Sequence, residues 1–140
     1  MRLKHRERGG AALELALFLP WFVFLFVGAF DWGIYAHSLI SVESAARAAC
    51  QYTSHASANK ADSTTACTYV VAEMKISPNV TAATCAALPL IVTAAGATGP
   101  DSREASTVTV TYQTPKLIPI PGLLTGQATI TRVVTMRVGS

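Results

Sequence analysis

Acidic side chains are scarce in this sequence, and the few that occur are scattered. Eight Asp and Glu residues occur among 140, and those beyond Tyr35 are Glu43, Asp62, Glu73, Asp101 and Glu104. No paired carboxylates, Ser/His/Asp arrangement or glycine-rich phosphate loop is apparent in the sequence, so it lacks the usual groups for catalysis. The sequence therefore argues against an enzyme, and we expect no cofactor.

Cysteine is also rare, and its spacing does not suggest a metal site. Cys50, Cys67 and Cys85 form neither a C-x-x-C pair nor a Cys/His cluster at zinc spacing. His37 and His55 are too far apart on a helix to share a metal. We expect a Cys67–Cys85 disulfide, because Cys50 falls within a predicted continuous helix; closing that loop would contribute about 3 kcal/mol. The alternative is three unpaired cysteines, and the odd one is expected to be buried or to join another chain.

Basic residues exceed acidic ones, but much of the excess lies at the N-terminus. The formal net charge is +3, and Arg2, Lys4, Arg6 and Arg8 all precede Gly9. Beyond Tyr35, Lys and Arg exceed the acids by only two. That bias is too weak to indicate a nucleic-acid partner.

Charge is absent from Leu15 to Phe30. With the flanking segments Gly10–Glu14 and Asp31–Tyr35, this run predicts a helix of about 20–25 residues, enough to cross a hydrocarbon core of about 30 Å. Pro20 lies inside it, which membrane helices tolerate better than soluble ones. The basic residues before it predict a cytoplasmic N-terminus. We expect a single-pass protein of the inner (cytoplasmic) membrane, with its C-terminal domain periplasmic or extracellular.

A glycine pair precedes the apolar run. A secretory signal peptide is cut after its apolar core, whereas Gly9 and Gly10 come before it. A resemblance to a prepilin-type signal is carried by Arg8-Gly9-Gly10-Ala11-Ala12-Leu13-Glu14-Leu15. In such signals a membrane peptidase cuts after a glycine and leaves the helix on the mature protein. A cut between Gly9 and Gly10 makes Glu14 the fifth mature residue, where that family carries its glutamate. On spacing alone, Glu14 would be read as an acid that complements the helix dipole near the headgroups.

The first third of the chain resembles the TadE/TadF group, the minor pseudopilins of tight-adherence (type IVb-like) pilus systems. The resemblance runs from Arg8 to Pro20 and through Ser44–Ala49, and it continues weakly in Val108–Tyr112, Pro115–Gly122 and Ile130–Val138. Leu15 stands where these proteins commonly carry Phe. The resemblance implies a leader at 1–9, a transmembrane helix at 10–35 and an exported pilin-like domain at 36–140. It also implies three kinds of partner: a prepilin peptidase, other pilins or pseudopilins, and the pilus assembly platform.

Periodicity supports the same architecture. One helical stripe continues past the span through Trp32, Tyr35, Leu39, Val42, Ala46, Ala49 and Thr53, which predicts a first helix from about Gly10 to about Ser57. A second helix should start at an N-cap formed by Asp62 or Ser63 and stop before Pro78.

Three segments read as strands, and we expect them to pair as an antiparallel meander. They are Leu88–Thr93, Ser106–Gln113 and Ala128–Val138, with a loop through Gly96 and Gly99 after the first and a bulge near Arg132 in the last. The predicted fold is therefore α+β, a type IV pilin-like lollipop whose long helix packs on a small antiparallel sheet.

The loop between the last two strands is unusually apolar. It contains Leu117, Ile118, Ile120, Leu123 and Leu124. These side chains either tuck under the sheet or form a patch that binds a partner or touches the membrane.

The leading functional hypothesis is a non-catalytic minor pseudopilin that is trimmed at Gly9–Gly10 and helps to initiate, cap or support pilus assembly. The sequence does not distinguish a TadE role from a TadF role, decide whether the protein enters the fibre, or separate it from secretion-system pseudopilins. The alternative is an uncleaved membrane-tethered binding module or adhesin. An exported enzyme is disfavoured by the scattered acids.

Overall fold

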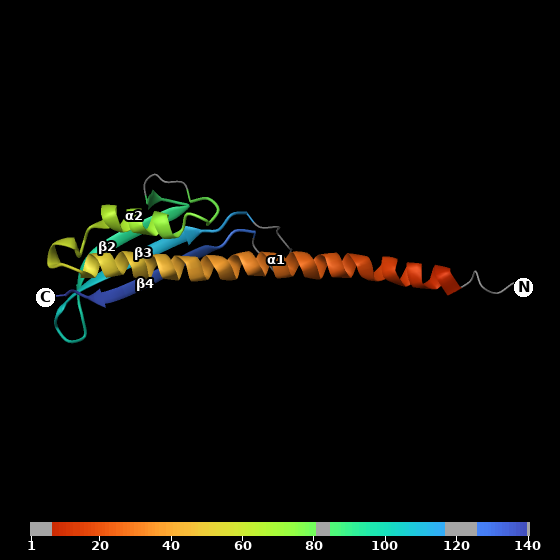
Figure 1. The fold of residues 1–140 in the computed structure, drawn as a ribbon, viewed down its shortest axis with the longest axis horizontal. Coiled ribbons are helices and arrows are strands. Elements are labelled where there is room, and N and C mark those ends of the chain that lie inside the picture. The colour runs from red at the N-terminus through yellow and green to blue at the C-terminus, as the bar shows by residue number, and fades with distance from the viewer. Residues whose placement is uncertain (1–6, 81–84, 117–125, 140) are drawn as a thin grey trace, which may run out of the picture. The chain divides into compact units, whose positions relative to one another are not determined.

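The computed structural model describes residues 7–80, 85–116 and 126–139. The chain divides into two compact units, Met1–Ile34 and Tyr35–Ser140. Helix α1 (Glu7–Ser54) belongs to both units and continues through Pro20 (Figure 1). It begins three residues before the predicted start and ends three residues before the predicted end.

In the first unit, α1 is an exposed apolar helix. Leu17 and Phe26 are each 73% exposed, and the other large apolar side chains from Leu13 to Phe30 are exposed or half-buried as well. The helix is long and apolar enough to cross a membrane. Large apolar side chains that lie exposed in the described part of the chain suit a lipid environment.

In the second unit, α1 presents one buried face. Val42, Ala46, Ala49 and Thr53 are fully buried, as the periodicity predicts, whereas Trp32 in the first unit is 64% exposed. The buried face also includes Ser38, Ala45 and Cys50. Small side chains let the helix approach the sheet closely. At the end of α1, the backbone N–H of Gly139 donates to the carbonyl of Ser54 at 2.9 Å and satisfies one terminal acceptor of the helix.

A 3₁₀ turn (Ser57–Asn59) leads to helix α2 (Ser63–Glu73). Asp62 is the N-cap, because its side chain accepts a hydrogen bond from the N–H of Thr65 at 3.0 Å. Ala66 and Val70 form the buried side of α2, and Met74 continues it.

Among the described residues, the sheet has four antiparallel strands in the order β1-β2-β3-β4, where three were predicted. The strands are β1 (Ala86–Ala87), β2 (Leu90–Thr98), β3 (Glu104–Gln113) and β4 (Thr129–Arg137). The prediction for β2 was wrong at both ends. Leu88 and Pro89 lie in the tight connection from β1, and the strand continues through Gly96 to Thr98, where a loop was expected. Every residue from Leu90 to Thr98 pairs with β3, so pairing extends the strand beyond its apolar segment.

The bulge predicted near Arg132 is absent, because β4 pairs with β3 one residue to one from Thr129 to Arg137. The strand tolerates the interruption of its pattern because it is the edge strand. Arg132 is exposed beside the helical layer, and Val133 is 60% exposed on the opposite, open face.

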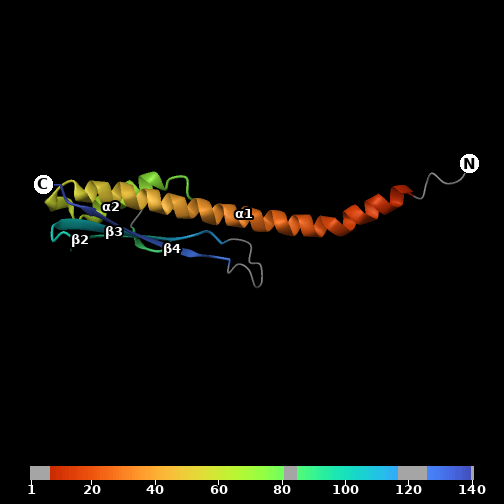
Figure 2. The same ribbon diagram turned by 90° about the horizontal axis from the view of Figure 1, so that it is seen from below.

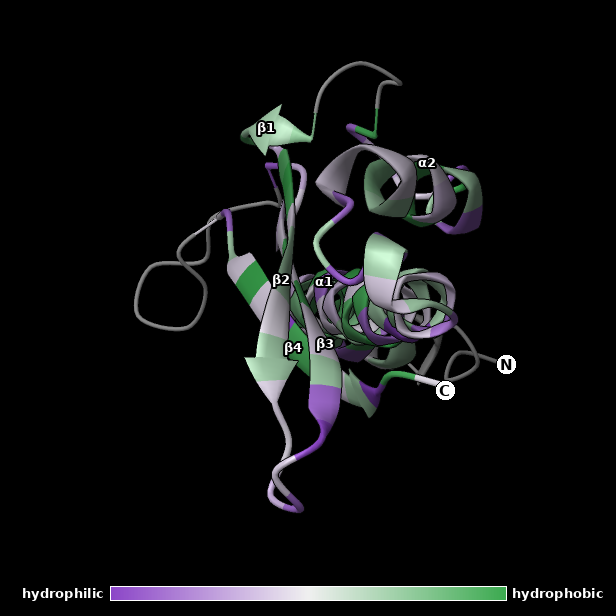
Figure 3. Ribbon diagram, turned by 90° about the vertical axis from the view of Figure 1, so that its left-hand side faces the viewer, coloured by the Kyte–Doolittle hydropathy of each residue, from purple (hydrophilic) through white to green (hydrophobic). Residues whose placement is uncertain are grey.

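Both helical segments of the second unit cover the same face of the sheet (Figures 2 and 3). Val108, Val110 and Tyr112 of β3 point into this core and are fully buried, as their alternation predicts. The other face is open and rich in threonine, with hydroxyl contacts between Thr107 and Thr135 at 2.9 Å and between Thr111 and Thr131 at 3.1 Å. The α+β arrangement of a long helix and a small antiparallel sheet is thus confirmed.

The outer edge of β2 is covered by neighbouring segments. The N–H of Val92 donates to the carbonyl of Cys85, and the N–H of Ala94 donates to the hydroxyl of Ser63, both at 2.8 Å. The side chain of Lys60 packs against the helix-side face of β2 at Gly96, since a Cβ placed there would come within 3.2 Å of it. At Val92 and Ala94 this edge therefore has no free backbone N–H group.

Candidate processing site and neighbouring features

The glycine pair lies in the first turn of α1. Gly9 and Gly10 are the third and fourth residues of the helix, and Gly10 is exposed with nothing within 4 Å of a Cβ built on it. The first N–H groups of a helix lack intrahelical acceptors, and each glycine costs about 1 kcal/mol of helix propensity relative to alanine. The local sequence therefore stabilises this first turn less than the turns that follow.

Glu14 lies one turn after Gly10, on the same side of the helix. Its side chain is exposed, and its neighbours Leu13 and Leu15 are 72% and 65% exposed. No ion pair involves Glu14 within the part of the chain that the structure describes. The site thus presents an exposed carboxylate on an apolar surface, four residues from the terminus that cleavage would create.

This segment also has a counterpart in a known family. Residues 9–51 match the family model described as TadE-like protein. This part of the chain is TadE-like. The resemblance to the TadE/TadF group that was drawn from this segment is thereby confirmed. The TadE-like segment begins at Gly9 and covers α1 almost to its end. Comparison with curated proteins and with solved structures finds no match.

The TadE-like segment contains a buried acid that sequence reasoning did not single out. The side chain of Asp31 is 2% exposed, and its Oδ2 has no hydrogen-bond partner among the described residues. Asp31 is the acid that ends the uncharged run. That position was the sequence feature that could have marked it as unusual. Burying a carboxylate oxygen without a hydrogen-bond partner lowers the stability of the folded state. Asp31 is therefore, together with Glu14, a candidate functional residue of this segment.

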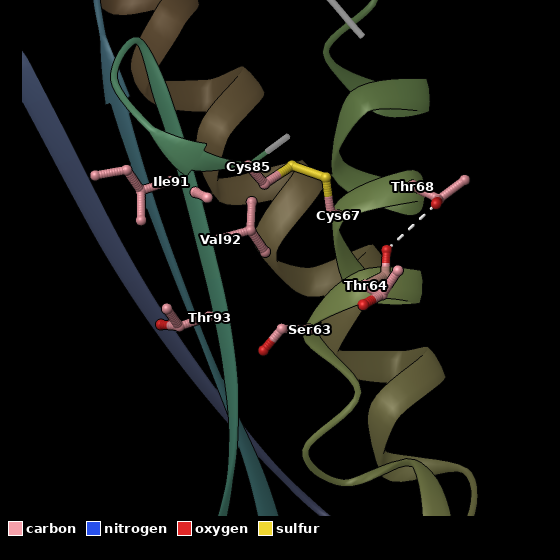
Figure 4. Close-up of a pocket in the computed structure, with 9 residues that line it drawn as sticks. Ser63, Thr64, Cys67, Thr68, Cys85, Ile91, Val92 and Thr93 are labelled. Carbon is pink, nitrogen blue, oxygen red and sulfur yellow. Dashed lines mark hydrogen bonds between the residues drawn. A yellow bond between two sulfur atoms is a disulfide. The ribbon is translucent and has the colours of Figure 1, made fainter. Parts of the chain in front are cut away.

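The two cysteines paired in the sequence analysis meet between α2 and the start of the sheet. The Sγ atoms of Cys67 and Cys85 are joined, with their Cα atoms 5.8 Å apart. The bond lines an open cavity of about 530 Å³ together with Ser63, Thr64, Thr68, Ala86, Ile91, Val92 and Thr93 (Figure 4). It attaches α2 to the short β1 connection.

Cys50 stays unpaired and buried within the core. Its Sγ lies 3.4 Å from the carbonyl oxygens of Ser106 and Val134. Burial raises the pKa of the Cys50 thiol, and the surrounding hydrogen bonds lower it less. The neutral thiol is therefore favoured, and Cys50 serves as a small core residue rather than as a nucleophile.

Two further features from the sequence concern the apolar loop before β4 and metal binding. The five apolar residues Leu117, Ile118, Ile120, Leu123 and Leu124 lie outside the described residues. Among the residues that are described, no group of three or more His, Cys, Asp or Glu side chains could hold a metal ion. The TadE-like segment is therefore the strongest functional feature.

Proposed function

We propose that this protein is a non-catalytic minor pseudopilin of a tight-adherence pilus system. A prepilin peptidase cuts it between Gly9 and Gly10, and the mature protein stays in the inner membrane through α1 with its second unit exported. There it helps to initiate, cap or support assembly together with other pilins or pseudopilins and the assembly platform. The observation that carries the proposal is the TadE-like match from residue 9, which includes the glycine pair and Glu14.

The chemistry of the mature terminus supports this role. Cleavage removes four basic residues and leaves a charged amino group on Gly10. In lipid, neither that amino group nor the exposed Glu14 carboxylate is favourable alone. Pairing the carboxylate with the amino terminus of a neighbouring subunit neutralises both charges, which links processing to packing of the helices.

The processing step is tested by co-expressing the full chain with a prepilin peptidase and measuring the intact mass and N-terminal sequence of the extracted product. We expect the product to begin at Gly10, and Gly9→Val to block cleavage. Gly28→Val is the matched control, because Gly28 lies in the same helix with open space around its Cα. Its product should still begin at Gly10.

The same measurement decides against the alternative function. If Met1 persists in the wild type and in both variants, the glycine pair is only the start of a helix. The protein would then be an uncleaved membrane-tethered binding module or adhesin.

A further inference from the structure

In the part of the chain that the structure describes, strand β4 ends the sheet and its outer backbone groups have no hydrogen-bond partner. The N–H of Thr114 donates to the carbonyl of Ala128. This bond shows which residue pairs of β3 and β4 exchange backbone hydrogen bonds and which do not. Even-numbered residues of β4 therefore bond to β3, and Thr131, Val133 and Thr135 direct their N–H and C=O groups outward. No partner for these outward groups occurs among the described residues. In contrast to β2, this edge has three successive open pairing positions.

The open edge adjoins a groove beside α1. A cavity of about 420 Å³ is lined by Glu43 and Arg47 of α1 and by Arg132, Val133, Val134 and Thr135 of β4. Arg47 pairs with Glu43 at 2.5 Å, whereas Arg132 is exposed and has no ion-pair partner in the described chain. The groove therefore carries one uncompensated positive charge directly on the open strand.

We propose that the outer edge of β4 accepts an extended segment of another protein chain as a fifth strand, and that this segment carries an acidic side chain opposite Arg132. The inference deepens the assembly role proposed above and rests on it for the presence of a neighbouring chain. Backbone pairing at Thr131, Val133 and Thr135 provides attachment, and the groove selects the side chain.

The register explains why Arg132 selects the partner. On an added antiparallel strand, the residue opposite Arg132 belongs to a pair without backbone hydrogen bonds, in which side chains approach most closely. It also lies on the helix side of the sheet, in the groove with Arg47. A carboxylate at this position meets an unpaired guanidinium. The residue opposite Val133 falls on the open face, where a β-branched side chain fits best.

A second copy of this chain suits the edge less well. If two β4 strands paired antiparallel about their centres, the two Arg132 side chains would lie opposite each other or on the adjacent diagonal. Like charges in such positions are destabilising. The described part of the chain also offers no acidic residue within β4 itself.

The experiment uses the full chain in nonionic detergent and two fluorescent nine-residue peptides of alternating Thr and Val. One peptide has a central Glu and the other has a central Lys. Fluorescence anisotropy should show tighter binding of the Glu peptide. Arg132→Glu should weaken Glu-peptide binding by about three- to tenfold and strengthen Lys-peptide binding. Arg103→Glu, which changes the net charge equally at an exposed position outside the groove, should leave the preference unchanged.

A backbone variant separates edge pairing from simple charge attraction. Val133→Pro removes one outward N–H, which an edge strand tolerates because no ladder bond is lost. It should abolish binding of the Glu peptide while the circular dichroism spectrum is retained. Thr131→Pro provides the same test if Val133→Pro fails to fold.

Each other outcome overturns the inference. Equal binding of both peptides, unchanged binding to the proline variants, or no binding at all would exclude an acidic partner strand on β4. Dimers of the chain that Val133→Pro converts to monomers would assign the edge to a second copy instead. Since peptide binding does not depend on the leader, its failure is distinguishable from a failure of processing at Gly9–Gly10.

Discussion

The hydroxyl group of Tyr112 provides a direct test of how the second unit is held together. Tyr112 is fully buried in β3, and its hydroxyl donates to the backbone carbonyl of Pro78, in the segment after α2. The substitution Tyr112→Phe removes the donor and keeps the ring. We therefore expect the free energy of unfolding to fall by about 0.5–1.5 kcal/mol, the net value of one hydrogen bond. In thermal unfolding of a unit of this size, each kcal/mol corresponds to a shift of about 4–8 °C in the melting temperature.

The pH dependence of this loss has a definite sign. Burial raises the pKa of Tyr112 above its ordinary value of 10.0. The folded state thus favours the neutral phenol, so its contribution is full below about pH 10 and declines as the pH rises through the folded pKa. Phenylalanine does not titrate. The difference in stability between wild type and Tyr112→Phe should therefore shrink above pH 10.

The assay is urea unfolding of the full chain in nonionic detergent, followed by near-ultraviolet circular dichroism. Tyr69→Phe is the matched control, because Tyr69 is 44% exposed and its ring stacks on Tyr52 with centroids 5.0 Å apart. The decrease in the free energy of unfolding caused by Tyr69→Phe should stay below about 0.5 kcal/mol. Equal losses for the two variants, or a difference that does not shrink at high pH, would refute the reasoning.

Three further predictions use the same preparation. Serine at both Cys67 and Cys85 removes a crosslink between residues 18 apart, and urea unfolding should show a loss of about 3 kcal/mol; an unchanged midpoint would mean that the crosslink does not constrain the unfolded chain. Iodoacetamide at about pH 8 should spare Cys50 in the folded chain and modify it in urea, as intact mass will show; labelling of the folded chain would contradict its burial. Asp62→Ala removes the cap of α2 and should lower the urea midpoint. Hydrogen bonds from Thr65 lower the pKa of Asp62, so this contribution is present above about pH 4 and is lost as the pH falls through the folded pKa. Wild type and Asp62→Ala should then converge in acid, and a gap that persists there would contradict the assignment.

Local patterns predicted the elements whose faces differ in polarity. The alternation around Val108, Val110 and Tyr112 gave β3, because one face of that strand is buried and the other is open. The three- and four-residue spacing through Val42, Ala46 and Ala49 gave the buried side of α1 for the same reason. In these elements, burial and sequence period coincide.

Other features depend on pairing between distant segments, which leaves no local pattern. Ala94–Thr98 is rich in small residues, yet it is strand because β3 lies beside it. The bulge at Arg132 was predicted wrongly because an edge strand can expose an arginine without breaking its register. The candidate processing site could be found from sequence, since Gly9, Gly10 and Glu14 form a short linear motif. The burial of Asp31 and the open edge of β4 could not, since both depend on what surrounds the residue in space.

The difference between the two edges of the sheet limits how many additional strands the second unit can accept. One edge is occupied at Ala94 by the Ser63 hydroxyl and at Val92 by the Cys85 carbonyl. The other edge, at β4, is open. A unit with two open edges can polymerise without limit through its sheets, whereas a unit with one can take a single additional strand. Edge pairing by this protein would therefore stop at a one-to-one complex, so any repeating contact along a fibre would have to come from a different surface.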